Sequence, residues 1–317
     1  MKKMFAIFLS VLMVLPMAAC GDSGDAPKTM KIAIVQQLDH SSLDEIRMAI
    51  EAELTAPEFE VKVYNGQNDA SVMNQIGTEI VSEEYDLIIA IATTAAQIMV
   101  TAADGQIPVV YAAVSDPEGN GLTGFANVTG TSDALNTPFI LDMMLACQPD
   151  IQTVGLLYST SEVNSETPIA EAKAYLEAKG IAFLEKTGNT AGEVISAASD
   201  LVGRVDAVFT PTDNVVMAAE ASVAELLNNA GIAHYTGADS FVQSGAFTTC
   251  GVNYTELGTY TAQMAMSILG GGEVPEFHVM DGGIITVNTE TAAALNLDYS
   301  VFSSMANTIV EVVTAAE

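Results

Sequence analysis

Polar side chains follow several short apolar runs of this chain, at the point where each run ends. The segments rich in hydroxyl, amide and carboxylate groups are 36–42, 93–94, 115–117, 159–165, 210–214 and 237–240. Side chains of these types hydrogen-bond small polar molecules. They also cap helix N-termini, which is the alternative for any one of them. Taken together, the segments predict a hydrogen-bonding cage for a small polar solute.

A free amino acid would need one partner for its carboxylate and another for its ammonium group. The chain has two arginines, Arg47 and Arg204, and both fall outside these segments, on a predicted helix and before a predicted strand. We therefore expect backbone N–H groups at a helix N-terminus to hold the carboxylate. The hydroxyl groups of Ser42, Thr93 and Thr94 are expected beside them.

The candidate ligand-binding residues are polar residues of these segments: Ser41, Ser42, Thr93, Thr94, Ser115, Asp116, Asn164, Ser165, Thr212, Asp213, Asn214 and Asp239. Asp213 or Asp239 is expected to face the ammonium group, with helix capping as the alternative for each. Tyr111, Tyr158 and Tyr254 lie at or near predicted strand ends, where a ring can stack on a flat ligand; core packing is the alternative.

The elements that would position these residues alternate between short β-branched runs and longer amphipathic runs, which is typical of parallel βαβ units. Strands are predicted at 31–36, 60–64, 86–92, 109–114, 153–158, 181–186, 207–210 and 233–236, with helices between them. The strands are nearly all apolar, as expected when helices cover both faces of a sheet. The fold class predicted is α/β, with two Rossmann-like, doubly wound parallel-sheet lobes joined by a hinge with several crossovers.

The predicted domains follow from this alternation. Residues 1–19 are a signal peptide and 20–29 a lipid-anchored linker; 30–125 with 254–280 form the first lobe, and 126–253 with 281–317 form the second. The segment 115–132, rich in Gly, Asn, Thr and Asp, is predicted to be the first crossing between lobes. Ligands of open α/β sheets bind outside the carboxyl ends of the strands, so the polar segments are expected to line a cleft between the lobes.

The N-terminus has the pattern of a secretory signal: Lys2 and Lys3, an apolar run over 4–15, and small residues before Cys20. The ending Ala18-Ala19-Cys20 resembles the lipobox of bacterial lipoproteins, in which the cysteine is lipidated. The resemblance implies an extracytoplasmic protein anchored to the cell membrane by lipidated Cys20, with no other membrane contact.

Composition excludes several classes of function. The formal net charge of −30 repels nucleic acid and anionic lipid surfaces. No Gly-x-Ser-x-Gly, Walker or dinucleotide-binding motif follows a predicted strand, so we expect no catalysis and no cofactor. The histidines are scattered, and no metal site is predicted. Cys147 and Cys250 are expected to be two separate buried thiols rather than a disulfide.

Five segments carry a resemblance to a known family. They are 108–117 (PVVYAAVSDP), 127–130 (NVTG), 157–158 with 162–165 (LY and EVNS), 211–214 (PTDN) and 251–258 (GVNYTELG). In this order they resemble the ABC transporter substrate-binding lipoproteins of the tryptophan or aromatic amino-acid-binding type. The first loop departs from that pattern, because His40 is followed by Ser41 and Ser42 where a proline commonly follows the histidine.

The resemblance implies a type I periplasmic-binding-protein fold that closes on an α-amino acid, often aromatic, and an ABC permease as partner. It places eight of the candidates at ligand-facing positions: Thr93, Thr94, Ser115, Asp116, Asn164, Thr212, Asp213 and Asp239. We expect a monomer. Two alternatives stay open from the residues: a binding protein that signals to a receptor or kinase, and an importer component for a nucleoside, sugar or small peptide.

Overall fold

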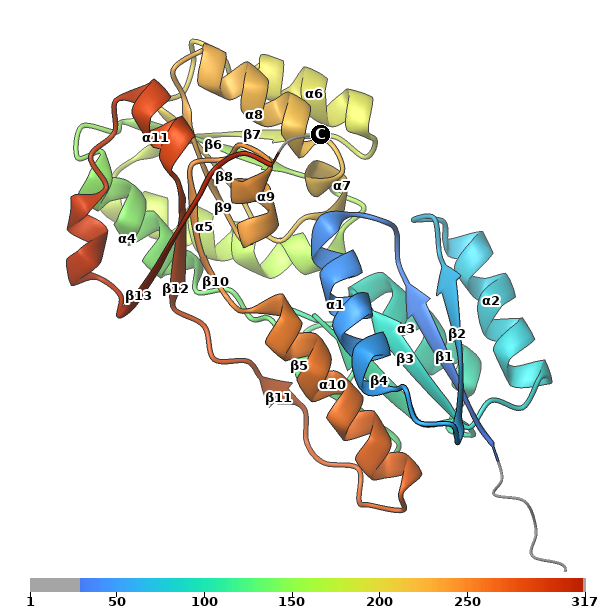
Figure 1. The fold of residues 1–317 in the computed structure, drawn as a ribbon. Coiled ribbons are helices and arrows are strands. Elements are labelled where there is room, and N and C mark those ends of the chain that lie inside the picture. The colour runs from blue at the N-terminus through green and yellow to red at the C-terminus, as the bar shows by residue number, and fades with distance from the viewer. Residues whose placement is uncertain (1–28, 316–317) are drawn as a thin grey trace, which may run out of the picture.

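The computed structural model describes residues 29–315 and contains two α/β lobes (Figure 1). The sheet of the first lobe holds six parallel strands, in spatial order β11 (His278–Val279), β5 (Val128–Ser132), β4 (Val109–Ala112), β3 (Leu87–Ile91), β1 (Met30–Gln36) and β2 (Phe59–Asn65). Its helices are α1 (Ser41–Glu53), α2 (Ala70–Ser82), α3 (Thr93–Ala103) and α10 (Tyr254–Leu269).

Both faces of this sheet are buried, and alternate residues of β1 point to opposite faces. Ile32 and Ile34 pack in the core cluster that contains Ile46 of α1 and Leu257 of α10. Ala33 and Val35 pack in a second cluster, under α2 and α3. The apolar run over residues 32–35 of β1 follows from this two-sided cover.

The sheet of the second lobe has the strand order β13 (Thr308–Val312), β12 (Ile284–Asn288), β10 (Thr248–Gly251), β9 (Ala233–Thr236), β8 (Ala207–Thr210), β6 (Thr153–Tyr158) and β7 (Ala182–Thr187). β12 runs antiparallel to β10, and the other pairs are parallel. The surrounding helical segments are α4 (Thr137–Cys147), η1 (Val163–Ser165), α5 (Glu166–Lys179), α6 (Ala191–Ser199), α7 (Asn214–Met217), α8 (Glu220–Asn229), α9 (Asp239–Gln243), α11 (Thr289–Leu295) and η2 (Ser300–Ser304). The predicted α/β class with two doubly wound lobes is confirmed.

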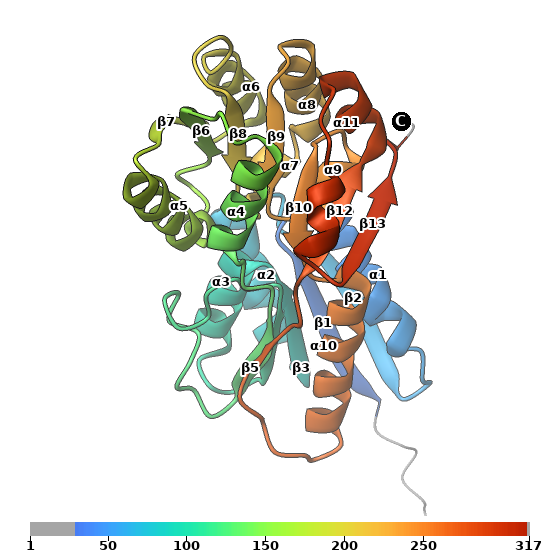
Figure 2. The same cartoon turned by 90° about the vertical axis from the view of Figure 1, so that its left-hand side faces the viewer.

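Three crossings connect the lobes: 133–136 between β5 and α4, 252–253 between β10 and α10, and 280–283 between β11 and β12 (Figure 2). The first differs from the prediction, because β5 pairs with β4 and extends the first lobe to Ser132 instead of residue 125. The sequence of β5, VTGTS, lacks an apolar run. Gly130 is needed there, since a Cβ at this position would lie 2.1 Å from the carbonyl oxygen of Tyr111.

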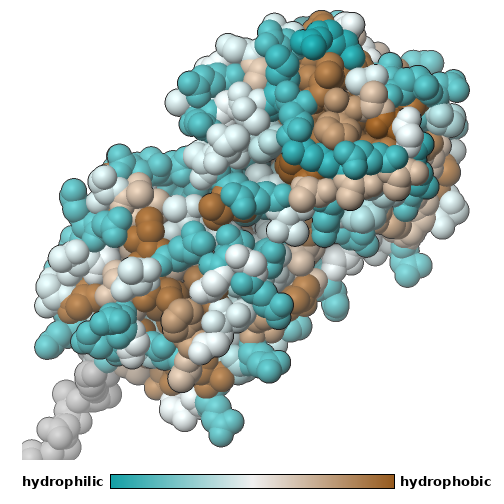
Figure 3. Space-filling model, turned by 180° about the vertical axis from the view of Figure 1, so that it is seen from behind, coloured by the Kyte–Doolittle hydropathy of each residue, from teal (hydrophilic) through white to brown (hydrophobic). Residues whose placement is uncertain are grey.

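The rear face of the molecule carries hydrophilic side chains over both lobes, with hydrophobic residues in separate patches (Figure 3). Among residues 29–315, no helix is both long and apolar enough to cross a bilayer. The predicted signal peptide and the lipidation of Cys20 lie outside the described residues and stay predictions. Cys147 and Cys250 are both free thiols; Cys250 is buried and Cys147 is half-buried.

Candidate ligand-binding site

A small cavity of about 20 Å³ lies where the two lobes meet, at the carboxyl ends of strands from both sheets. From the first lobe it is lined by His40, Ser42, Leu43, Ala92, Thr93, Ala113, Ser115 and Tyr254. From the second lobe and the first crossing it is lined by Asp133, Asn164, Thr212, Asp213, Asn214, Met217, Ala238 and Phe241. So small a space holds about one water molecule. The lobes are therefore closed on each other more tightly than they would be around a solute, which must enter as they open.

Hydrogen bonds between the lobes hold this closed form. Gln37 Nε2 donates to Glu162 Oε1 at 3.0 Å, and the hydroxyls of Ser115 and Thr212 lie 3.2 Å apart. The hydroxyls of Ser42 and Ser240 are also bonded across the cleft. The polar loops of the two lobes therefore contact each other directly.

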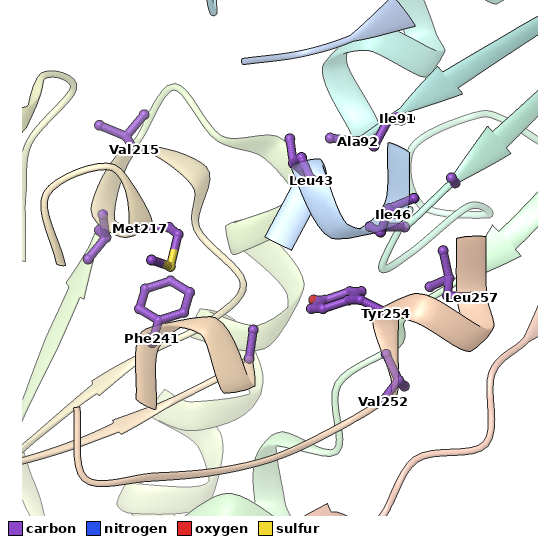
Figure 4. Packing of buried hydrophobic residues seen from close by; sticks show 14 of the residues in the cluster. Leu43, Ile46, Ile91, Ala92, Val215, Met217, Phe241, Val252, Tyr254 and Leu257 are labelled. Carbon is purple, nitrogen blue, oxygen red and sulfur yellow. The ribbon is translucent and has the colours of Figure 1, made fainter. Parts of the chain in front are cut away.

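An apolar cluster also continues across the cleft. Leu43 and Tyr254 of the first lobe belong to the same buried cluster as Met217 and Phe241 of the second. Figure 4 shows the Tyr254 ring pointing from the start of α10 toward the second lobe. The site thus has an apolar side beside its polar side, as ligand pockets commonly do.

Three buried polar atoms at the cavity lack a hydrogen-bond partner: His40 Nδ1, Thr93 Oγ1 and Asn164 Oδ1. Buried polar atoms are nearly always paired in folded proteins, so a cluster of unpaired ones needs an explanation. His40 Nε2 lies 3.0 Å from Asn214 Oδ1 and must donate, because the amide nitrogen of Asn214 is bonded to Glu162. Burial lowers the pKa of His40, which leaves a neutral ring whose Nδ1 accepts.

The N-terminus of α3 lies at this cavity, which Ala92 and Thr93 line. Its N-cap residue, Ala92, has φ +78° and ψ 163°, a conformation that L-residues rarely adopt. Ala113, after β4, has φ +54° and also lines the cavity. Strained backbone at two neighbouring strand ends is typical of a binding site, and a helix N-terminus attracts an anionic group.

Asp133 is a buried carboxylate of the cavity that the sequence did not predict. It accepts hydrogen bonds from Ser115 Oγ at 2.8 Å and Tyr254 OH at 3.1 Å. Burial raises the pKa of Asp133, and no Lys or Arg is among the lining residues to offset its charge. Asp133 directly follows β5. Because the sequence of β5 is polar, this strand was not predicted, and Asp133 was not recognised as a residue at a strand end.

Asp213 lines the cavity but is bonded mainly within its own lobe. Its Oδ2 accepts from the backbone N–H of Ser159 and from Ser165 Oγ, both at 2.7 Å, and its Oδ1 accepts from Val216 N at 2.9 Å. It is the N-cap of α7, which was the alternative to ligand contact. Burial raises the pKa of Asp213 despite these bonds.

The structure brings some predicted residues to the cavity and leaves others beside it. The lining includes Ser42, Thr93, Ser115, Asn164, Thr212, Asp213 and Asn214. The others, Ser41, Thr94, Asp116, Ser165 and Asp239, are not among the lining residues. Asp116 Oδ2 instead accepts from Thr167 of the other lobe at 2.9 Å, so it links the lobes. The sequence analysis did not predict the apolar side of the cavity, which includes Met217 and Phe241. It also did not predict His40, which precedes the candidates Ser41 and Ser42 in the same loop.

Asp239 is expected to make stability depend on pH. Burial, together with the charge of Glu45 on the opposite lobe, raises the pKa of Asp239 to about 6. Since the folded-state pKa exceeds the unfolded value of about 4, the free energy of unfolding falls as pH rises between these values. Asp239→Asn should therefore be more stable than the parent above pH ~6, by on the order of 2 kcal/mol, and equal to it below pH ~4.

Urea unfolding at several pH values measures this difference. The matched control is Asp206→Asn, a carboxylate at the far end of the second-lobe sheet whose Oδ2 accepts from the backbone of Gln152 and Thr153. A gain for Asp239→Asn that is the same at all pH values would contradict the assignment to ionisation.

A buried hydroxyl–imidazole–carboxylate group lies elsewhere in the second lobe. His234 Nδ1 is 3.0 Å from Glu220 Oε1, and its Nε2 is 2.8 Å from Thr210 Oγ1. The types are those of a hydrolytic triad, but the side chains are at most 1% exposed. They form part of the core, where no substrate can reach them. Among the described residues, no cluster of His, Cys, Asp or Glu is suited to hold a metal ion.

Two closed α/β lobes with a polar cavity between them define a two-lobed solute-binding protein of the type I periplasmic-binding class. A family model described as ABC transporter substrate binding protein matches residues 31–307. The chain belongs to this family, which comprises substrate-binding proteins and not enzymes. The family resemblance that the sequence motifs carry is thereby confirmed.

Several relatives have informative names or states. The tyrosine-binding protein of Clostridioides difficile is 32% identical over 286 residues, covering 86% of this chain and 83% of that protein. The structure of an ABC domain in complex with L-Trp from Streptococcus pneumoniae is 27% identical with a TM-score of 0.83, covering 89% of this chain and all of that one. The ligand-free, open structure of a substrate-binding protein from Clostridium difficile is 31% identical with a TM-score of 0.67, covering 90% of this chain and 100% of that chain. The closed lobes of this chain thus resemble the complex more than the open form.

Proposed function

We propose that this protein is an extracytoplasmic lipoprotein that binds an aromatic α-amino acid between its lobes and delivers it, as a monomer, to an ABC importer. The observation that carries the proposal is the set of unpaired groups at the closed cavity. His40 Nδ1 and Asn164 Oδ1 are acceptors, and the buried carboxylate of Asp133 lies at the same cavity without a cation. A ligand ammonium group would satisfy these groups.

The other parts of an amino acid also have partners here. The α-carboxylate would bind the N-terminus of α3, beside the unpaired Thr93 hydroxyl. The side chain would lie against Met217 and Phe241 of the second lobe and Leu43 of the first. The tyrosine and L-Trp named for two relatives support an aromatic side chain. Contacts from both lobes would favour the closed form, which the permease recognises.

Calorimetric titration tests the proposal with analogues that lack one group each. L-tyrosine and L-tryptophan are expected to bind. Tyramine lacks the carboxylate, and 3-(4-hydroxyphenyl)propionate lacks the ammonium group; each should bind at least ~100-fold more weakly, because one set of buried protein groups stays unpaired. Binding of a nucleoside or sugar instead, or equal affinity for tyramine and tyrosine, would overturn the assignment.

Cellular assays address the remaining steps. Incorporation of labelled fatty acid should require Cys20 and be lost in Cys20→Ala. Uptake of the labelled amino acid should fall when the gene is deleted. Unchanged uptake together with a lost transcriptional response to the amino acid would favour the sensor alternative.

A further inference from the structure

A second cavity, of about 400 Å³, lies at the hinge behind the ligand site, and we refer to it as the hinge pocket. Its walls come from residues at or next to all three crossings between the lobes, 133–136, 251–252 with Tyr254, and 282–284, and from Phe139, Gly237, Cys250 and residues 305–308 of the second lobe. The volume is in the range of small-molecule sites. The ligand site at the front is twenty times smaller in this closed form.

The two cavities share a wall. Asp133 and Tyr254 line both, and Tyr254 OH donates to Asp133 Oδ2 at 3.1 Å. Both side chains are at most 5% exposed. The residues that we propose face the amino acid at the front therefore form the floor of the hinge pocket behind.

The walls combine apolar side chains with polar ones, among them Asn136, Asn307 and Thr308, and they disfavour an anion. Leu135, Phe139, Val252, Ile284 and Met305 supply apolar surface, and no Lys or Arg is among the lining residues. Asp133 already accepts bonds from Ser115 and Tyr254. An anion would meet the charge of Asp133 without a basic partner, and the ammonium group of the proposed front ligand already pairs with that charge, so an uncharged molecule fits the hinge pocket best.

Glycines leave the pocket open. Gly283 has φ +87°, and a Cβ there would have no atom within 4 Å. A Cβ on Gly282 would lie 3.7 Å from Gly251 O and 4.0 Å from Val252 Cγ1, which are ordinary contacts. A larger side chain at 282 can therefore occupy the pocket without displacing backbone.

We propose that the hinge pocket is a second binding site, for a small uncharged molecule, whose occupation favours the closed form. Opening the lobes changes the backbone of the three crossings that build its walls, so its shape depends on the angle between the lobes. A molecule that fits the closed pocket binds that form better. The coupling between the two sites is reciprocal. A molecule bound in the hinge pocket must therefore raise the affinity of the front site for the amino acid by the same factor by which the amino acid raises the affinity of the hinge pocket for that molecule.

Cys147 and Cys250 report occupation of the hinge pocket, with Cys20 replaced by Ala so that no third thiol reacts. Cys250 lines the pocket, while Cys147 lies outside it, near the carbonyl of Asp298. Cyclohexanol is the probe, and methyl methanethiosulfonate is the thiol reagent, with each site quantified by mass spectrometry. Cyclohexanol at twice its dissociation constant should slow modification of Cys250 about threefold and leave Cys147 unchanged.

Two variants sharpen the test. Gly282→Leu should abolish the protection of Cys250, and Gly192→Leu, on exposed α6 with no atom within 4 Å of its Cβ, should keep it. Saturation-transfer NMR of cyclohexanol should follow the same pattern. Equal protection of both cysteines, or protection that persists in Gly282→Leu, would overturn the proposal. Neither readout needs an amino acid at the front site, so this test and that of the proposed function can fail separately.

Discussion

Asp133→Asn is expected to weaken the binding of L-tyrosine or L-tryptophan by about 2 kcal/mol or more, roughly 30-fold or greater. The substitution keeps the size of the side chain and one acceptor for Ser115 or Tyr254. It removes the negative charge at the cavity, where no Lys or Arg is among the lining residues. The ligand ammonium group would then be buried against a neutral amide. Isothermal titration calorimetry of the parent and the variant measures the difference.

The control for this prediction is Asp239→Asn, which makes the same chemical change at a carboxylate beside the cavity. It should not weaken binding, because it removes repulsion by Glu45 across the closed cleft. Without ligand, Asp133→Asn should unfold no more easily than the parent, since burial raises the pKa of Asp133 and ionising it costs stability. Equal losses of affinity in both variants would refute a special role for Asp133.

Glu220→Ala is expected to lower the free energy of unfolding by about 3 kcal/mol. Glu220 is 1% exposed and bonded to His234, which is fully buried. Its removal leaves His234 Nδ1 without its hydrogen-bond partner and creates a cavity in the core of the second lobe. Urea unfolding followed by circular dichroism at neutral pH provides the measurement.

Glu225→Ala is the matched control for that change, because Glu225 lies on the exposed side of the same helix, α8. It should alter stability by less than about 0.5 kcal/mol. Under conditions where the Glu220→Ala variant is folded, this variant should bind the amino acid as the parent does, since neither Glu220 nor His234 lines the cavity. A loss of binding with unchanged stability would instead assign Glu220 to the ligand site.

Several features of the site could be predicted because they depend on residues that are close together in the sequence. Ser42 and Thr93 each follow an apolar strand directly or within one short loop, and the carboxyl ends of parallel strands meet at one edge of a sheet. The same rule predicts Thr212 and Asn214 after β8, and both line the cavity. Asp239 met the rule as well, yet only its neighbours Ala238 and Phe241 line the cavity. The rule gives the edge of the sheet on which a residue lies, but not the direction of its side chain.

The sequence by itself determined the α/β class, the two lobes and the family, because hydrophobic periodicity and short motifs are properties of neighbouring residues. Only the tertiary structure decided that β5 belongs to the first sheet and that the carboxylate of Asp213 accepts hydrogen bonds from its own lobe. It also decided that Asp133 contacts Tyr254 at the wall shared by the two cavities. Asp133 and Tyr254 are 121 positions apart. Contacts of this kind depend on strand order and on the closure of one lobe upon the other, and no local pattern records either.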